Sequence, residues 1–270
     1  MLGSSPAISL TGEVMKALTE ASRALLYYTA GQVDRGVLGF QAAKARGEVL
    51  TPLIKAWGTD VGIEIASLGI QVHGGMGFVE ETGAAQHWRD SRIAPIYEGT
   101  NGIQAADLVT RKLALENGEA LISLVEDIAR ECADEPMLFA LAGDCAAIAK
   151  WMREDASLDD RLAGSVPFCT MLAVATAGWQ LSRQLKGIEE GTDRAKAKHA
   201  TVRFFLDRIV PEASGLKASA TAGGARARPR GGARTAPRGR RRTARTRRSA
   251  SARRAPLAGS CTVRTGATCT

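Results

Sequence analysis

Apolar residues recur at three- and four-residue steps along most of the first 216 residues of the chain. The clearest stripes span residues 14–28, 54–68, 121–132, 138–152 and 202–209. This spacing places apolar side chains along one face of a helix that packs against a neighbour. We find no sustained two-residue alternation and no hairpin signal between β-branched runs. The pattern therefore predicts an all-α fold, an antiparallel bundle of helices in two packed parts.

Capping signals suggest where some of these helices begin and end. Thr51 before Pro52 predicts an N-cap followed by a first-turn proline, so we expect a helix to begin there. Gly74 and Gly75 predict that this helix stops after about Gln71. The last stripe predicts a helix that begins near Thr192.

The segment from residue 71 to 102 interrupts this regular pattern. It contains "QVHGGMGFVEETG", with Gly74, Gly75 and Gly77 close together after a predicted helix. Such a run lets the backbone approach a ligand, with amides pointing at an anion, but it also suits a tight connection. The glycines alone leave both interpretations open. The next stretch holds Arg89, Asp90 and Arg92, which we interpret as a local ion-pair clamp.

Charge divides the chain into two unlike parts. Residues 1–216 hold 21 basic and 28 acidic residues, whereas residues 217–270 hold 15 basic residues and no acidic one. The second stretch consists almost wholly of Arg, Ala, Gly, Pro, Ser and Thr. It has too few apolar residues to form a core, so we predict that it is disordered.

Three interpretations of the basic tail compete. It could bind nucleic acid through phosphate attraction, or an anionic membrane surface, or it could be the product of translation out of frame in a GC-rich gene. The abrupt change and the prevalence of residues with GC-rich codons favour the frameshift. No aromatic residue lies among the arginines, so the stacking typical of a single-strand binder is missing. Nonspecific polyanion binding is expected whatever the tail's origin.

The amino-acid composition indicates which classes of protein the chain can belong to. With 45% apolar residues, the chain can bury a substantial core. It has no run of eighteen or more apolar residues and no secretory signal, so we expect a cytoplasmic protein without a membrane partner. Its five cysteines are odd in number and widely spaced, which argues against a disulfide framework and a zinc site. We predict no metal site.

One stretch of about forty residues carries a family resemblance. The run "GIQVHGGMGFVEETGAAQHWRDSRIAPIYEGTNGIQAADLVTRK" resembles the C-terminal signature of the acyl-CoA dehydrogenase family, in which a Gln-x-x-Gly-Gly-x-Gly turn precedes an Arg-Asp helix and a Tyr-Glu-Gly-Thr loop. The resemblance extends more loosely over residues 15–216. The part after Lys112 is similar to an extra C-terminal helical region found in one branch of the family. The basic tail does not belong to the pattern.

The resemblance implies roles for named residues. Glu98 would be the catalytic base that removes a proton α to a thioester carbonyl while a hydride leaves the β carbon for the flavin of FAD. Gly99 would lie against the substrate. The residues implied to contact FAD are Thr100, Asn101 and Gly102, and those implied to approach the FAD of a neighbouring subunit are Gln71, Val72, His73, Gly74 and Gly75.

The resemblance also implies domains and partners. We expect a C-terminal helical domain in residues 1–115, truncated at its start, an additional helical region in 116–216, and the Arg-rich tail in 217–270. Family members carry an N-terminal helical domain and a β-domain before this region, and these domains help to hold the flavin and the acyl-CoA. We therefore expect weak or absent dehydrogenase activity from this chain alone. The implied partners are an acyl-CoA substrate, an electron acceptor for the flavin and further copies of the chain. The alternative is a noncatalytic helical interaction module whose tail binds polyanions.

Overall fold

The structure, a computed structural model, describes residues 6–224 and contains no strand within that range. These residues belong to one unit, Met1–Arg230, and the second unit, Gly231–Thr270, lies outside the described range. The all-α prediction is therefore confirmed for the described chain.

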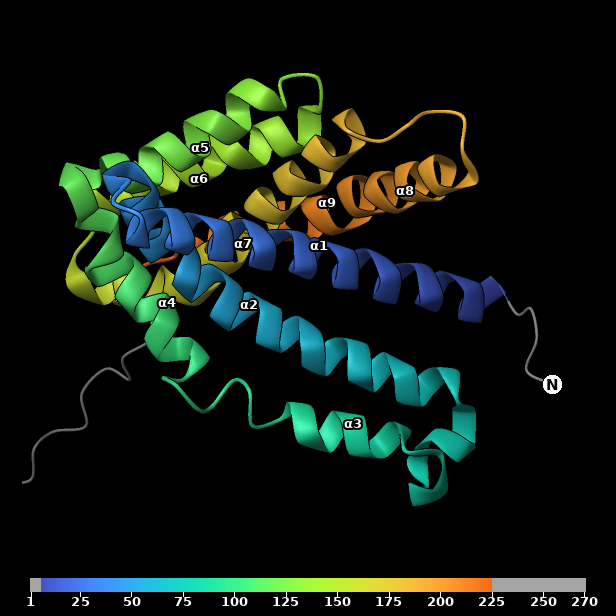
Figure 1. Ribbon diagram of the computed structural model, residues 1–270. Coiled ribbons are helices and arrows are strands. Elements are labelled where there is room, and N and C mark those ends of the chain that lie inside the picture. Colours follow the sequence, from blue (N-terminus) through green and yellow to red (C-terminus); the bar gives the residue numbers. More distant parts are fainter. Residues whose placement is uncertain (1–5, 225–270) are drawn as a thin grey trace, which may run out of the picture. The chain divides into compact units, whose positions relative to one another are not determined.

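Two long helices form a hairpin that opens as it leaves its turn. α1 (Pro6–Val37) and α2 (Gln41–Val72) are joined by three residues, and Figure 1 shows them side by side near this turn and then diverging. The first part of α2 is buried in the bundle from Ala43 to Val61 at the positions that face neighbouring helices. The second part leaves the bundle and carries α3 (Ala84–Ser91) along it as an arm. α4 (Asn101–Thr110) then returns the chain to the bundle.

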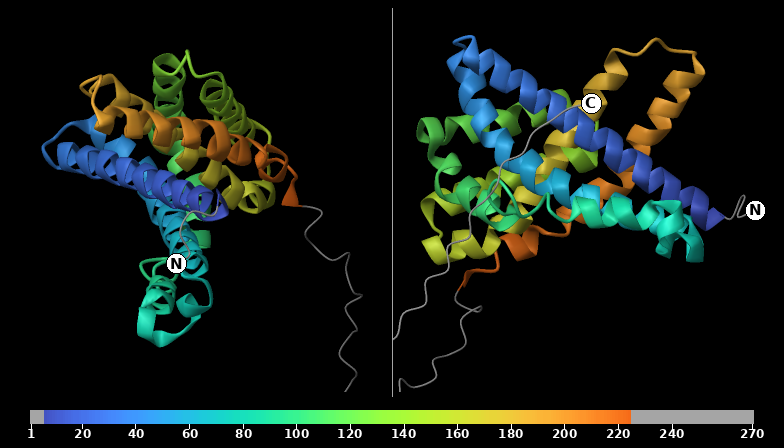
Figure 2. Two further views of the ribbon diagram at one scale, coloured as in Figure 1. Left: turned by 90° about the vertical axis from the view of Figure 1, so that its right-hand side faces the viewer. Right: turned by 60° about the horizontal axis from the view of Figure 1, so that its bottom comes forward.

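The rest of the bundle is built around one central helix. α5 (Glu119–Glu131) and α6 (Pro136–Glu154) pack on α7 (Leu158–Lys186), in which every residue from Met171 to Ser182 is buried. α7 is long and apolar enough to cross a membrane, but 72% of its apolar window is buried inside the protein, so it is a core helix of the bundle. The chain continues through α8 (Asp193–Phe204), a π-helical turn (Phe205–Ile209), α9 (Val210–Ser214) and α10 (Lys217–Ala220). Figure 2 shows α8 beside α1.

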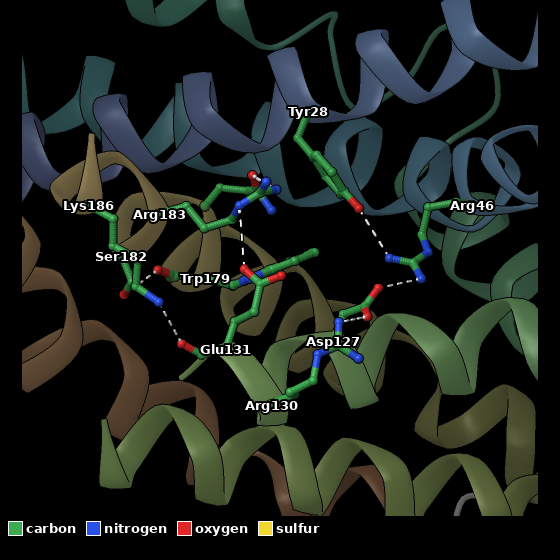
Figure 3. Close-up of polar contacts among 11 residues, drawn as sticks. Tyr28, Arg46, Asp127, Arg130, Glu131, Trp179, Ser182, Arg183 and Lys186 are labelled. Atoms are coloured by element: carbon green, nitrogen blue, oxygen red, sulfur yellow. Dashed lines mark hydrogen bonds and ion pairs between the residues drawn. The ribbon is translucent and has the colours of Figure 1, made fainter. Parts of the chain in front are cut away.

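A polar network joins the first helical hairpin to α5. The Arg46 guanidinium, on α2, donates to the Tyr28 hydroxyl at 3.1 Å and to Asp127 Oδ2 at 2.9 Å (Figure 3). It also donates to Ser123 Oγ at 3.1 Å. Arg130 forms a second ion pair with the same Asp127 carboxylate. Beside it, the ring of Tyr28 meets the indole of Trp179 edge to face, with ring centroids 5.3 Å apart. One continuous core therefore carries a polar seam at the junction of α1, α2, α5 and α7.

The helices follow the predicted stripes, with one boundary wrong. Thr51 and Pro52 do not begin a helix, because α2 begins at Gln41 and runs through both. Pro52 removes one backbone donor, and the turn before it is kept because its apolar face is buried. The Thr51 hydroxyl donates to the Gly47 carbonyl at 2.8 Å within that helix instead of capping its start. The predicted stop after Gln71 and the predicted start near Thr192 are confirmed.

The predicted disorder of residues 217–270 is wrong at its beginning. Lys217–Ala220 forms a helical turn, Lys217 Nζ lies 2.7 Å from Asp144 Oδ1, and Ala220 is fully buried. The turn is ordered because these contacts anchor it to α6 and α7. Residues 225–270, which hold the arginine clusters, lie outside the described range, and the tail interpretations stay predictions.

Candidate functional site

Glu98 lies on a tight turn between α3 and α4. After α3 the chain makes consecutive turns, with Ile96 N donating to Ile93 O at 3.0 Å and Asn101 N donating to Pro95 O at 3.0 Å. The second bond closes a loop whose tip is Glu98. Thr100 then caps α4, since its hydroxyl accepts a hydrogen bond from Ile103 N at 3.2 Å.

The backbone at Glu98 has an unusual conformation. Glu98 has φ +55° and Gly99 has φ +82°, so two successive residues occupy the left-handed region. Glycine adopts it freely, whereas a residue with a Cβ does so at a cost of about 1–2 kcal/mol. Strained residues of this kind cluster at functional sites. The carboxylate is exposed and makes no hydrogen bond or ion pair with any residue in the range 6–224.

Exposed apolar side chains lie close to Glu98 along the chain. Ile93, Ile96, Tyr97 and Ile103 are each more than half exposed, although they are large and apolar. Such a gathering is typical of a surface that another molecule covers.

Asn101 attaches this turn to α2. Its side-chain amide donates to Ala56 O at 3.0 Å, Thr59 Oγ1 at 2.9 Å and Asp60 Oδ1 at 2.8 Å. Its side-chain oxygen accepts from Lys55 Nζ at 3.0 Å. The amide of Asn101 is therefore engaged within the chain at both of its atoms.

The carboxyl group of Asp60, which accepts a hydrogen bond from Asn101, has a raised pKa. Burial raises its pKa above the usual range, and three contacts oppose the rise: the hydrogen bond from Asn101 and the charges of Lys55 and Arg92. The Asn101 amide thus lies between the Asp60 carboxylate and the Lys55 ammonium. Lys55 and Asp60 were not predicted as site residues, because they lie more than forty residues before Asn101 and carry no local motif.

The glycine turn lies at the other end of the α3 arm. α2 ends at Val72, and His73 Nδ1 donates to the Gly69 carbonyl at 2.8 Å. Gly74 has φ +60°, and Gly74 and Gly75 are exposed. A Cβ built on Gly75 would meet nothing within 4 Å, whereas one on Gly77 would lie 2.2 Å from the Ile70 carbonyl oxygen. Gly77 is thus required by close packing, and Gly75 leaves its backbone open to a partner.

The structure keeps the two predicted cofactor-contacting groups apart. Asn101 contacts α2 around Asp60, and the glycine turn begins at His73, which places them about 20 Å apart along the helix at its rise per residue. Figure 1 shows the turn and the start of α4 at opposite ends of the α3 arm. Within one chain, Gln71, Val72, His73, Gly74 and Gly75 therefore form one group and Glu98 to Gly102 another.

The predicted ion-pair clamp among Arg89, Asp90 and Arg92 is wrong, because Arg89 pairs with a residue outside this set. Arg89 pairs with Glu80 at 2.9 Å, because the turns after the glycines bring Glu80 beside α3.

Within residues 6–224, no three His, Cys, Asp or Glu side chains lie close enough to hold a metal ion.

Two family models match consecutive parts of the chain. Residues 1–113 match "Acyl-CoA dehydrogenase, C-terminal domain", and residues 124–227 match "Acetyl-CoA dehydrogenase C-terminal like". The boundary between the two matches falls near Glu116 and Asn117, where the backbone again takes positive φ values.

Known relatives extend well beyond the matched region. A 3-methylmercaptopropionyl-CoA dehydrogenase of Ruegeria pomeroyi is 39% identical over 236 residues, which cover 78% of this chain and 40% of the relative. A butyryl-CoA dehydrogenase of Syntrophomonas wolfei is 32% identical and covers 77% of this chain and 38% of the relative. The chain thus spans about 40% of the length of such relatives.

Solved structures share the fold. An acyl-CoA dehydrogenase of Bacillus anthracis complexed with FAD aligns with a TM-score of 0.59 at 21% identity, over 77% of this chain and 39% of its own. ACDH-11 of Caenorhabditis elegans, in complex with C11-CoA, aligns with a TM-score of 0.60 at 17% identity, over 77% and 37%. From the two family matches and these relatives, we conclude that the chain belongs to the acyl-CoA dehydrogenase family and carries its C-terminal helical domains.

Proposed function

We propose that this chain supplies the catalytic base and part of the flavin site of an FAD-dependent acyl-CoA dehydrogenase. The observation that carries the proposal is the exposed carboxylate of Glu98, which stands on a left-handed turn without a partner among residues 6–224, in a chain of this family. Turnover would need the rest of the length that the relatives have, on the same or another polypeptide.

In the proposed reaction, Glu98 accepts the proton from the carbon α to the thioester carbonyl. An acyl chain lying over Ile96, Tyr97 and Ile103 would exclude water from the carboxylate and strengthen it as a base. Gly99, the next residue after the base along the chain, would lie against the substrate through its backbone. Bound FAD would supply the acceptor for the hydride that leaves the β carbon.

The residues of this chain fit contacts to FAD mainly through their backbone. Gly75 and Gly102 are exposed, and a Cβ on either would meet nothing closer than 3.9 Å, so a ligand can approach the main chain. Thr100 and Gly102 stand beside Glu98, whereas Gln71, Val72, His73, Gly74 and Gly75 would reach the FAD of a neighbouring copy. The side chain of Asn101 is bonded to α2 and its backbone N–H donates to Pro95 O, so both donors are already engaged within the chain.

The remaining partners follow from the same proposal. The substrate is an acyl-CoA thioester, the oxidant is an electron acceptor for the flavin, and the chain assembles with copies of itself. The proposed location is cytoplasmic. Any binding of nucleic acid would be nonspecific and would depend on the basic tail in residues 225–270.

A chimera tests the role of Glu98. The part of the Ruegeria pomeroyi relative that precedes the matched region would be joined to this chain, purified with FAD and assayed with 3-methylmercaptopropionyl-CoA. We expect turnover, and we expect Glu98→Gln to lower it about 10²–10⁴-fold, the usual contribution of a general base. Glu81→Gln, at an exposed glutamate before α3, is the matched control. Turnover that survives Glu98→Gln would refute the assignment of the base.

The chain by itself also gives a direct measurement. It would be incubated with FAD and desalted, and its visible absorption spectrum recorded. A retained flavin spectrum would support the proposed backbone contacts. A colourless protein would contradict flavin binding by this chain alone, and the chimera assay would then decide the role of Glu98.

A further inference from the structure

We propose that Gln104 is the positioning residue that holds Glu98 in its left-handed conformation, and that Asn101 is the anchor of the same turn. This inference rests on the proposed role of Glu98 as the base. Under this proposal, the side-chain amides of Gln104 and Asn101 hold the turn in place, which is a role separate from contact with the flavin.

The turn needs such a restraint because its conformation is unfavourable. Glu98 carries a Cβ and yet has φ +55°, and Gly99 follows with φ +82°. An unrestrained residue other than glycine would leave this region, since the more common conformations are lower in energy by about 1–2 kcal/mol. The conformation persists only where the surroundings over-determine it.

Gln104 supplies the restraint at the tip of the turn. Its side-chain amide donates to the Glu98 carbonyl oxygen at 3.1 Å. Gln104 is itself fixed in the first turn of α4, where its backbone N–H donates to Thr100 O at 2.9 Å. A Cβ on Gly99 would lie 3.1 Å from the same amide nitrogen, so the glycine makes room for this contact. The bond thus ties the carbonyl of the base to the helix that follows it.

Asn101 supplies the second restraint, at the base of the turn. Its side-chain amide is bonded to three oxygen atoms on α2, and its oxygen accepts from Lys55 at 3.0 Å. Its backbone N–H donates to Pro95 O and closes the loop that contains Glu98. The start of α4 is therefore fixed to α2, and Gln104 transmits that fixed position to Glu98.

Positioning of this kind matters because a base must reach the substrate proton within hydrogen-bond distance. A misplacement of about 1 Å can lower a rate about 100-fold. The Glu98 side chain has no partner of its own among residues 6–224, so its direction depends on the backbone from which it leaves. The carbonyl-to-Gln104 bond defines that direction.

The experiment uses NMR on the complete 270-residue chain without substrate or flavin. Gln104→Met keeps the length of the side chain and removes the donor. Gln104→Glu replaces it with a carboxyl that can donate only when protonated. Gln86→Met, at an exposed glutamine on α3, is the matched control. The amide resonance of Gly99 and the backbone ¹³C shifts of Glu98 are followed over pH, with circular dichroism as the check on folding.

We expect Gln104→Met to shift these resonances at every pH while helix content is unchanged. We expect Gln104→Glu to differ from the wild type at neutral pH, where two oxygens would repel, and to regain its shifts as the introduced carboxyl is protonated. A purely structural role in α4 would give no such recovery. Shifts in Gln104→Met no larger than those in Gln86→Met, or no recovery at low pH in Gln104→Glu, would overturn the proposal. Neither outcome depends on turnover, so the chimera assay judges the role of Glu98 separately.

Discussion

Replacing Arg46 with methionine removes the polar link between the first hairpin and α5. The guanidinium of Arg46 is 12% exposed and donates to Tyr28, Ser123 and Asp127 (Figure 3). Methionine keeps much of the apolar stem that packs in the seam but carries no charge and no donor. The substitution therefore isolates the contribution of the hydrogen bonds and the ion pair.

The expected loss follows from what remains after the substitution. Removing one member of a fully buried ion pair costs about 3–5 kcal/mol, because the other charge is left without a partner. Here Asp127 is 26% exposed and keeps Arg130, and Ser123 still donates to a backbone carbonyl at 3.3 Å. We therefore expect Arg46→Met to lower the free energy of unfolding by about 2–3 kcal/mol, chiefly from the lost charged hydrogen bonds.

Arg130→Met is the matched control, since Arg130 pairs with the same carboxylate but is 68% exposed. Exposed pairs contribute about 0–1 kcal/mol. Urea unfolding followed by circular dichroism measures both variants. Equal effects of the two substitutions, or a loss below about 1 kcal/mol for Arg46→Met, would refute the reasoning.

Tyr28 provides an independent optical test of the same link. Burial raises the pKa of Tyr28, and the charge and hydrogen bond of Arg46 oppose that rise. Removing Arg46 should therefore move the ionisation of Tyr28 to still higher pH, as followed by tyrosinate absorbance in an alkaline titration. An unchanged or lower ionisation pH in Arg46→Met would contradict the contact.

Three further predictions concern the glycine turn, a carboxylate and a thiol. Gly77→Ala should distort the turn and lower stability by about 1–3 kcal/mol, because its Cβ would lie 2.2 Å from a backbone carbonyl oxygen of α2, whereas Gly75→Ala should leave thermal unfolding unchanged. Burial, and secondly the charge of Glu212, raise the pKa of Glu64 above its ordinary value of 4.5. The contribution of Glu64 to stability is thus complete below 4.5 and is lost as pH rises through the folded-state pKa, so Glu64→Gln should stabilise the protein at neutral pH and not in acid, as compared by urea midpoints. Burial also raises the pKa of the Cys145 thiol, which is fully buried, so a thiol reagent should leave its peptide unmodified by mass spectrometry until the protein unfolds.

The amphipathic helices were predictable because their information is local. The stripes at residues 121–132 and 138–152 became α5 and α6, since a helix on the surface of a bundle needs apolar residues on one side only. The apolar stripes did not predict α7, because its apolar residues are not confined to one side. From Met171 to Ser182 it is buried all round, so no single face stands out against a polar one.

Local signals failed where packing outweighed them. Thr51 and Pro52 form a good start signal for a helix, but α2 begins ten positions earlier because its first turns are buried against α1 and α7. The first residues of the predicted tail are ordered for a similar reason, as Ala220 is buried in the bundle. In both places the burial of apolar surface, which depends on distant residues, decided the outcome.

The sequence by itself determined the helical class, the family and the position of the candidate base, because periodicity and the Tyr-Glu-Gly-Thr motif are written in consecutive residues. Only the tertiary structure decided how Glu98 is held. Lys55 and Asp60 lie on another helix, and their meeting with Asn101 depends on the crossing of α2 and α4. The left-handed conformation of Glu98 likewise depends on Gln104, six residues away, whose amide reaches back only after α4 has formed.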